Sequence, residues 1–262
     1  MSVITLPHGL RIDLQESGAP DGAALVLVHE LGTDPRLWAG VLAQLPPELR
    51  VLSLALRGHG RSEVPAPPYA MGALVRDVEA LLDHMGLGDT VLAGLGLGGM
   101  VAQGLAVKRL DQVRALVLSG TAAKLGRPEL WQRRAALALE GGMEAVAEEL
   151  LPRWTGRKTP LEAATQMRAM LLDCPAQGYA GGAMAIAGTD FYTPTSGLRL
   201  PVLGLAGSED YETPPDLQRE TVELIPGARF ELLRGAGHLA CLEQPEGFAG
   251  ALTQFLREIG HL

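Results

Sequence analysis

Apolar runs alternate along the chain with stretches of helical periodicity. A continuous apolar run, typical of a strand buried on both faces of a sheet, occurs at 24–28, and further strands rich in apolar residues are expected at 50–56, 91–93, 113–118, 201–206 and 229–233. An opening hairpin is expected within 3–14. Helices are expected after Pro35 and at 71–85, 214–224 and 244–259. This alternation predicts an α/β fold with a mainly parallel central sheet and helices on both of its faces.

One segment, from Leu125 to Thr195, interrupts the alternation. It contains helix-like stretches at 129–139, 143–151 and 160–172 and no convincing strand. We interpret it as a helical lid inserted after the strand at 113–118. The predicted domains are therefore a core formed by 1–124 and 196–262, and a lid (cap) formed by 125–195.

Length, charge and cysteine content narrow the class of protein. A chain of 262 residues suits one domain with an insertion. The net charge of −8 argues against non-specific nucleic-acid binding, and an apolar run of about 18 residues, as needed to span a membrane, does not occur. The first residues have no pattern of a secretion signal, and Cys174 and Cys241 lie far apart. We expect free thiols and a cytoplasmic protein that binds neither nucleic acid nor membrane.

The stretch Thr90 to Met100 combines a short apolar run, a glycine-rich turn and a helical stretch. A strand–turn–helix of this kind with the pattern Gly-x-Ser-x-Gly is the elbow that holds an attacking serine, and its turn tolerates only small flanking residues. Gly94 and Gly98 occupy the two flanking positions here, and Gly96 stands between them at the nucleophile position. The sequence predicts the elbow without the nucleophile.

Two further polar residues follow predicted strands in the order expected of a catalytic triad. Ligand sites form beyond the carboxyl ends of parallel strands. Asp210 follows the strand at 201–206 and His238 follows the strand at 229–233, which gives the order nucleophile position, acid, base. Either residue alone is an ordinary loop residue, and Glu209 competes for the role of the acid. We prefer Asp210, because it matches the resemblance described next.

Several motifs over nearly the whole chain resemble those of α/β-hydrolases and, within them, of the 3-oxoadipate enol-lactonase branch. The matching motifs are His29-x-Leu31-Gly32-Thr33-Asp34, Leu37-Trp38, Arg57-Gly58-His59-Gly60-Arg61-Ser62, Trp131-x-x-Arg134, Gly142-Met143, Arg153-Trp154, Gly178-Tyr179-Ala180, Ala206-Gly207-x-x-Asp210-x-x-Thr213-Pro214-Pro215 and Gly237-His238. The resemblance implies an esterase or lactonase that acts on a small-molecule carbonyl substrate.

The resemblance also implies a role for each site residue. His238 would take a proton from the nucleophile, and Asp210 would orient and stabilise the imidazolium. The backbone N–H groups of Leu31 and Leu97 would form the oxyanion hole. In the lid, Trp131, Arg134 and Trp154 would hold an anionic substrate or, equally, pack the lid around a solvated arginine. No metal or organic cofactor is implied, because the chain has no His/Cys cluster.

Three departures from the pattern fall at the site. Gly96 replaces the serine, Glu30 stands where the branch usually has a small residue, and Ala55 stands where a polar residue is often found. Loss of a triad nucleophile typically lowers turnover by about a millionfold. The ordinary covalent mechanism is therefore excluded for this sequence.

Several alternatives remain open. The first is an ester or lactone hydrolase whose nucleophile has been replaced, which leaves it inactive or altered. The second is a nucleophile-free enzyme (a lyase, isomerase, cyclase or general-base hydrolase) that uses His238 and Glu30 with the oxyanion hole. The third is a non-catalytic binding protein that uses the old pocket. For Glu30 itself, a side chain that points to solvent is a further alternative. We favour the first.

Overall fold

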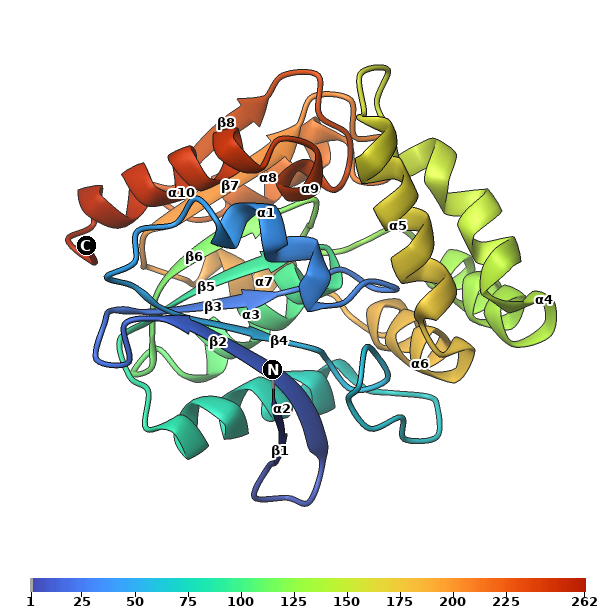
Figure 1. The fold of residues 1–262 in the computed structure, drawn as a ribbon, viewed down its shortest axis with the longest axis horizontal. Coiled ribbons are helices and arrows are strands. Elements are labelled where there is room, and N and C mark those ends of the chain that lie inside the picture. Colours follow the sequence, from blue (N-terminus) through green and yellow to red (C-terminus); the bar gives the residue numbers. More distant parts are fainter. Residues whose placement is uncertain (1) are drawn as a thin grey trace.

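The computed structural model describes residues 2–262 and has one mixed sheet in which the strands follow the order β1-β2-β4-β3-β5-β6-β7-β8 (Figure 1). β2 pairs antiparallel with both β1 and β4, and all other neighbouring strands pair in parallel. The strands are β1 (Ser2–Thr5), β2 (Arg11–Gly18), β3 (Ala24–Val28), β4 (Arg50–Leu54), β5 (Thr90–Leu95), β6 (Val113–Ser119), β7 (Val202–Gly207) and β8 (Arg229–Leu233). The predicted mainly parallel α/β sheet is confirmed.

Helices cover both faces of this sheet (Figure 1). α2 and α3 lie on one face, and α1 and α10 lie together on the other. The helices of the described chain are a 3-10 turn η1 (Pro35–Trp38), α1 (Ala39–Leu42), α2 (Met71–Met85), α3 (Leu97–Lys108), α4 (Pro128–Trp154), α5 (Leu161–Asp173), α6 (Ala176–Ala187), α7 (Tyr192–Ser196), α8 (Pro215–Glu223), α9 (Ala240–Glu243) and α10 (Pro245–Glu258).

The core forms where the apolar runs of the sequence meet on both faces of the sheet. β3, β5 and β7 are buried at every position, as expected of parallel strands that lie between two layers of helices. α2 instead buries one apolar face and ends at Gly86, which adopts the left-handed conformation that glycine permits at a helix end. The sheet therefore provides a rigid base whose strand ends carry the loops of the site.

The segment between β6 and β7 contains α4, α5, α6 and α7 and no strand among its described residues. α4, α5 and α6 gather beside one end of the sheet (Figure 1), whereas α7 packs on α3. The helices predicted at 129–139 and 143–151 are one element, α4, broken at Gly142, where φ is 76°. α6 and α7 are not among the helices predicted from the sequence. A separate lid domain over 125–195 stays a prediction.

Two further expectations concern the thiols and the membrane. Cys174 and Cys241 are free, as predicted, and the structure shows that both are buried. In residues 2–262 we find no helix that is long and apolar enough to cross a membrane.

Candidate functional site

The turn between β5 and α3 has the sharp geometry predicted for an elbow. Gly96, at its apex, has φ 51° and ψ −111°, a conformation that L side chains rarely adopt. A Cβ on Gly94 would overlap the backbone of Gly98, and a Cβ on Gly98 would overlap the carbonyl of Val28 at the end of β3. Small residues are therefore required at both flanking positions, because the turn presses directly on the neighbouring strand.

The space above Gly96 is filled by the side chain of Glu30. A Cβ added to Gly96 would overlap the Glu30 Oε2 and Cδ atoms. Glu30 is 5% exposed and lies at the carboxyl end of β3. The alternative in which this side chain points to solvent is therefore wrong. Glu30 therefore fits in this place only because position 96 has no side chain.

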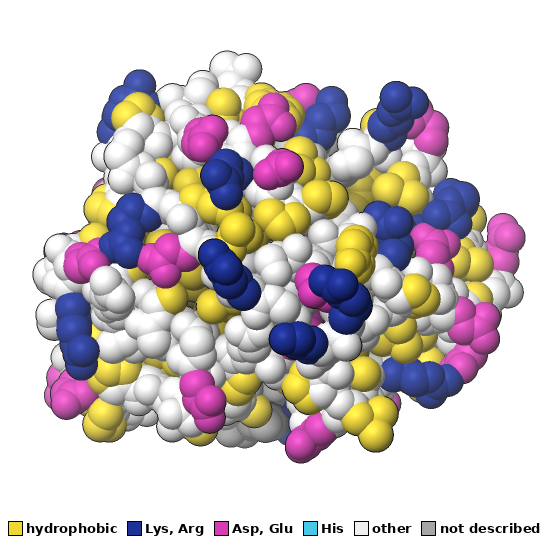
Figure 2. Space-filling model, turned by 90° about the horizontal axis from the view of Figure 1, so that it is seen from above, with side chains coloured by type: hydrophobic (Ala, Val, Ile, Leu, Met, Phe, Trp, Pro, Cys, Tyr) yellow, Lys and Arg dark blue, Asp and Glu magenta, His cyan; other side chains and the backbone are white. Residues whose placement is uncertain are grey.

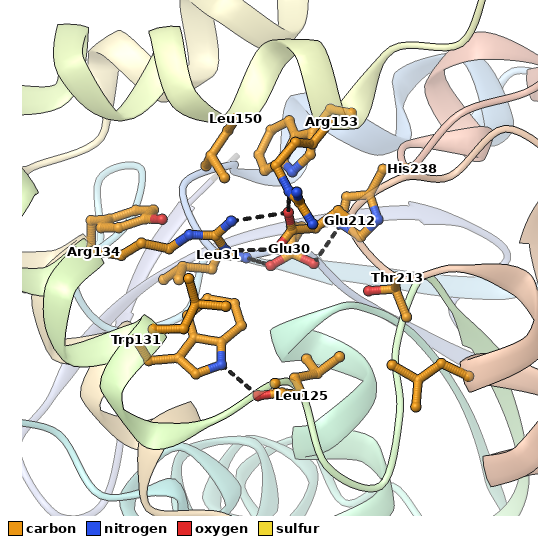
Figure 3. A pocket seen from close by; sticks show the side chains of 15 residues that line it. Glu30, Leu31, Leu125, Trp131, Arg134, Leu150, Arg153, Glu212, Thr213 and His238 are labelled. Atoms are coloured by element: carbon orange, nitrogen blue, oxygen red, sulfur yellow. Dashed lines mark hydrogen bonds and ion pairs between the residues drawn. The ribbon is translucent and has the colours of Figure 1, made fainter.

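The Glu30 carboxylate is held by both amides that were predicted to form the oxyanion hole. Leu31 N–H donates to Oε1 at 2.5 Å, and Leu97 N–H points to the same oxygen at 3.4 Å. The other oxygen, Oε2, lies 3.2 Å from His238 Nε2 (Figure 3). The carboxylate thus stands where a serine side chain and the oxygen of its substrate would otherwise lie.

His238 lies between two carboxylates. Its Nδ1 is 2.9 Å from Asp210 Oδ2, and Asp210 Oδ1 accepts the backbone N–H groups of Glu212 and Thr213, both at 2.8 Å. The backbone N–H of His238 donates to the Trp154 carbonyl at 2.9 Å. The structure brings Asp210, and not Glu209, to the imidazole; Glu209 instead pairs with Arg157 on the surface.

For both Glu30 and His238, burial and the neighbouring charged groups shift the pKa in opposite directions. Burial raises the pKa of Glu30 above 4.5, and the hydrogen bonds from His238, Leu31 and Leu97 only partly oppose it. Burial alone would lower the pKa of His238, but the charges of Asp210 and Glu30 outweigh burial and raise it well above 6.5. The imidazole therefore lies between two carboxyl groups, and their charges favour its protonated form.

Two neutral histidines support the loop that carries Glu30. Leu56 N–H donates to His29 Nε2 at 2.9 Å, and Gly32 N–H donates to His59 Nε2 at 3.1 Å. Burial lowers the pKa of His29, and burial with the neighbouring His29 lowers that of His59 to about 3. Both rings thus remain uncharged acceptors. In the sequence these two histidines stand out only as parts of the matching motifs.

A cavity of about 170 Å³ lies between the Glu30–His238 pair and α4 and α6 (Figure 3). Gly96 itself does not line this cavity. Most of the wall is apolar or aromatic: Leu31, Leu125, Leu130, Trp131, Leu150, Trp154, Tyr179 and Leu217. Such a wall fits a small organic molecule with few polar groups.

Arg134 reaches the cavity but is engaged by two glutamates. Its two Nη atoms lie 2.6 and 3.0 Å from the Glu212 carboxylate oxygens, and its Nε donates to Glu149 at 2.9 Å. Glu212 also accepts from Arg153. Although burial alone would raise the pKa of Glu212, the two arginines lower it to about 2. Arg134 is 2% exposed, so the expectation of a solvated arginine is wrong.

The predicted lid residues contact the site in different ways. The Trp131 indole N–H donates to the Leu125 carbonyl at 2.5 Å, and its ring lies 5.0 Å from the Arg134 guanidinium carbon. The Trp154 ring lies 5.6 Å from the His238 ring. The sequence analysis did not assign Glu212, Arg153 or Tyr179 to the site. Within residues 2–262 no group of His, Cys, Asp and Glu side chains could hold a metal ion.

Comparison with known proteins shows the family to which the chain belongs. A model of the alpha/beta hydrolase family matches residues 25–251. This chain belongs to the α/β-hydrolase family. The predicted α/β-hydrolase fold is therefore confirmed, and the relatives described next confirm the resemblance to the enol-lactonase branch.

Individual relatives of this α/β-hydrolase cover almost its whole length. It is 31% identical to the 3-oxoadipate enol-lactonase 2 of Acinetobacter baylyi, over 92% of this chain and 91% of the relative. Among solved structures, an esterase from Thermogutta terrifontis (TM-score 0.94, 30% identity, 99% of each chain) and an enol-lactonase from Burkholderia xenovorans (TM-score 0.92, 32% identity, 98% and 100%) are similar.

Proposed function

We propose that this α/β-hydrolase is an enzyme without a covalent nucleophile, which transfers a proton at the carbon next to a carbonyl group. Glu30 is the base, and His238, aligned by Asp210, holds the proton that keeps Glu30 oriented. One observation carries the proposal: the Glu30 carboxylate occupies the apex of the elbow and is hydrogen-bonded to His238. The second alternative of the sequence analysis is thus favoured over the first.

The position of Glu30 supports a catalytic role over mere loss of activity. A buried carboxylate requires compensating hydrogen bonds, and Glu30 obtains them from two amides and an imidazole. Its raised pKa brings the base closer to neutral pH, where a general base is most effective. A hydrolase silenced only at position 96 would not need a carboxylate there. A binding protein would not need the aligned Asp210–His238 pair.

The cavity favours a substrate of a particular kind. Its arginines, Arg134 and Arg153, are paired with glutamates, so the bound part of the substrate is proposed to be uncharged rather than anionic. Cys174 and Cys241 do not line the cavity, and burial raises the pKa of both thiols. Neither cysteine can replace the serine as a nucleophile.

Lactone or ester hydrolysis by general-base activation of water is the second candidate. The relatives named as enol-lactonases and an esterase favour it. In this case Glu30 would take its proton from water rather than from carbon. The two candidates share the base and differ in the bond that breaks.

Exchange of substrate hydrogens with solvent deuterium distinguishes the two candidate functions. The protein is incubated in D₂O with a panel of small cyclic ketones, enol lactones and aryl esters, and ¹H NMR follows both the loss of α-hydrogens and the formation of carboxylate product. We expect α-hydrogen exchange in the parent, abolished in Glu30→Gln and retained in part in Glu30→Asp. Hydrolysis without exchange, abolished by the same Glu30→Gln change, would establish the second candidate instead.

The proposed proton transfer predicts the shape of the pH dependence of kcat/KM. Activity requires ionised Glu30 and protonated His238, and the pKa of each is raised. We therefore expect a bell-shaped profile of kcat/KM whose acid limb lies above pH 4.5 and whose alkaline limb lies above pH 6.5. Activity that keeps rising with pH would show that neutral His238 is the base.

A further inference from the structure

The proposed proton transfer places a negative charge on the substrate's carbonyl oxygen, and this charge needs a hydrogen-bond donor. The two amides that serve this purpose in an unoccupied oxyanion hole, Leu31 N–H and Leu97 N–H, both face Glu30 Oε1 here. A carbonyl compound in the cavity must therefore find its donor on another wall. The following inference rests on the proposed function.

Tyr179, on α6, supplies such a donor. It lines the same cavity and is 0% exposed. Its hydroxyl is buried and has no hydrogen-bond partner among residues 2–262. The neighbouring polar side chains differ in this respect, because Trp131 donates to Leu125 and Arg134 is bound by Glu212. A buried hydroxyl at the edge of a ligand cavity is satisfied when a ligand brings an acceptor.

The ring of Tyr179 is fixed by close packing on the loop that carries Glu30. A Cβ on Gly32 would lie 3.2 and 3.3 Å from the Tyr179 Cδ2 and Cε2 atoms, so the ring contacts this backbone directly. One position earlier, a Cβ on Gly178 would overlap the Gly58 carbonyl. α6 is therefore pressed onto the loops after β3 and β4, and the hydroxyl cannot move away with the helix.

The hydroxyl also remains protonated. Burial raises the pKa of Tyr179 further above 10, and the nearby Glu30 and Glu212 carboxylates act in the same direction. The neighbouring Arg134 only partly opposes them. At neutral pH Tyr179 is thus a neutral O–H donor in the wall of the cavity.

We propose that Tyr179 is a catalytic residue that donates its O–H to the carbonyl oxygen of an uncharged ketone or lactone with an acidic α-hydrogen. In the step, the α C–H bond breaks and its proton moves to Glu30 Oε2. The electron pair of that bond forms the new C=C bond, and the carbonyl π pair moves to the oxygen, where the Tyr179 hydrogen bond stabilises it. Return of the proton to the same or the conjugated carbon restores Glu30.

The test compares Tyr179→Phe with a matched control, Tyr69→Phe. Tyr69 is also buried and lies beside α6, but its hydroxyl donates to the Pro65 carbonyl at 2.8 Å and does not line the cavity. The probe is carbonyl-¹³C cyclohex-2-enone, and its bound C=O stretch and α-hydrogen exchange are both measured. We expect Tyr179→Phe to abolish the downward shift of the stretch and to lower kcat for exchange about a hundredfold, with KM changed far less. Tyr69→Phe leaves both readouts as in the parent.

The outcomes separate this inference from the proposed function. An unshifted carbonyl band in the parent, or a shift and an exchange rate that survive in Tyr179→Phe, would overturn the role of Tyr179. A shift that depends on Tyr179 in a protein without Glu30-dependent exchange supports the hydroxyl as the carbonyl donor and refutes the proton transfer. A melting temperature of Tyr179→Phe at or above the parent's excludes misfolding as the cause.

Discussion

At the scale of single residues, the site depends on an exchange between two positions. Gly96 leaves a space at the apex of the elbow, and Glu30 fills this space from the neighbouring strand end. The carboxylate then takes over hydrogen bonds from Leu31 and His238 that a substrate oxygen and a serine hydroxyl would make. The chemistry of the site therefore follows from the pair and not from either substitution alone.

The first prediction concerns this pair. Gly96→Ser alone should destabilise the protein by about 1–3 kcal/mol, because the new side chain overlaps Glu30 in a filled site. It should show no esterase activity, since the oxyanion-hole amides remain occupied. The double variant Glu30→Gly/Gly96→Ser should recover stability and hydrolyse aryl esters through His238 and Asp210. Melting temperature and ester turnover measure the two effects.

Glu30→Gly provides the matched control, since it opens the hole without supplying a nucleophile, and it should be inert toward aryl esters. If Gly96→Ser alone proves as stable as the parent and hydrolyses esters, Glu30 does not fill the serine position.

At the scale of elements, His238 is fixed by contacts between the end of α4 and the loop after β8. His238 N–H donates to the Trp154 carbonyl. Glu243, on α9, accepts Gly237 N–H at 3.0 Å with one oxygen and the Thr159 hydroxyl at 2.6 Å with the other. A helix of the inserted segment, a core loop and α9 are thus tied together next to the imidazole.

The second prediction concerns this connection. Thr159→Val removes the hydroxyl bound to Glu243 with little change of shape, and it should destabilise the protein by about 1 kcal/mol. Amide hydrogen exchange at Gly237 should become faster, because Glu243, which accepts this N–H, loses its hydrogen bond from Thr159. The control is Thr165→Val on the exposed face of α5, where the hydroxyl bonds only to its own helix. Equal exchange at Gly237 in both variants would argue against the connection.

The elements that could be predicted from sequence are those whose pattern is local. The buried strands β3, β5, β6 and β7 are recognisable in the sequence by their apolar residues, and the elbow is recognisable by its spaced glycines. α6 escaped prediction because it begins Ala-Gln-Gly-Tyr-Ala-Gly-Gly, and glycine disfavours an isolated helix. In the folded chain these glycines allow close approach to Gly58, Tyr69 and Leu31, which no local pattern reveals.

The site was predictable to a similar degree. The order of Gly96, Asp210 and His238 follows from motifs after strands, and the structure brings Asp210 and Glu30 to His238. The direction of the Glu30 side chain did not follow, because it depends on the turn after β3 and on the empty space above Gly96. The ion pairs of Arg134 likewise depend on Glu149 and Glu212, which the fold brings from α4 and from the loop before α8.

At the scale of the whole molecule, charged side chains are dispersed over the surface, whereas many buried titratable side chains lie near the site. Figure 2 shows basic and acidic side chains interspersed over one face without a broad area of a single sign. Many of the buried titratable groups, in contrast, lie around the loops of the site: His29, Glu30, His59, Asp210 and His238. The pH dependence of stability should therefore originate largely at this end of the sheet.

The third prediction is a loss of stability in mild acid. The pKa of His59 is about 3 in the folded protein and 6.5 in the unfolded chain, and that of His29 is also lowered. The unfolded chain therefore binds more protons, so the stabilisation is complete above pH 6.5 and decreases as the pH falls toward 3. Melting temperature measured from pH 7.5 to 5 should fall. Glu30 and His238, whose pKa values are raised, act in the opposite direction and reduce the slope.

His59→Gln isolates the effect. Glutamine keeps an acceptor for Gly32 N–H but does not titrate, so its melting temperature should depend less on pH between 6.5 and 5 than that of the parent. Parallel curves for the two proteins would show that His59 does not contribute.

The overlap between Glu30 and a side chain at position 96 also constrains the order in which the two residues could have been substituted. From an ancestor with serine at the elbow and a small residue at position 30, the two substitutions are not interchangeable in order. A glutamate that arrived first would have met the serine in a space large enough for one of them. A glycine that arrived first would have produced a folded, silent protein. For a protein descended from such a hydrolase, the sterically open order is therefore Gly96 first and Glu30 second, because the reverse order places two side chains in one space.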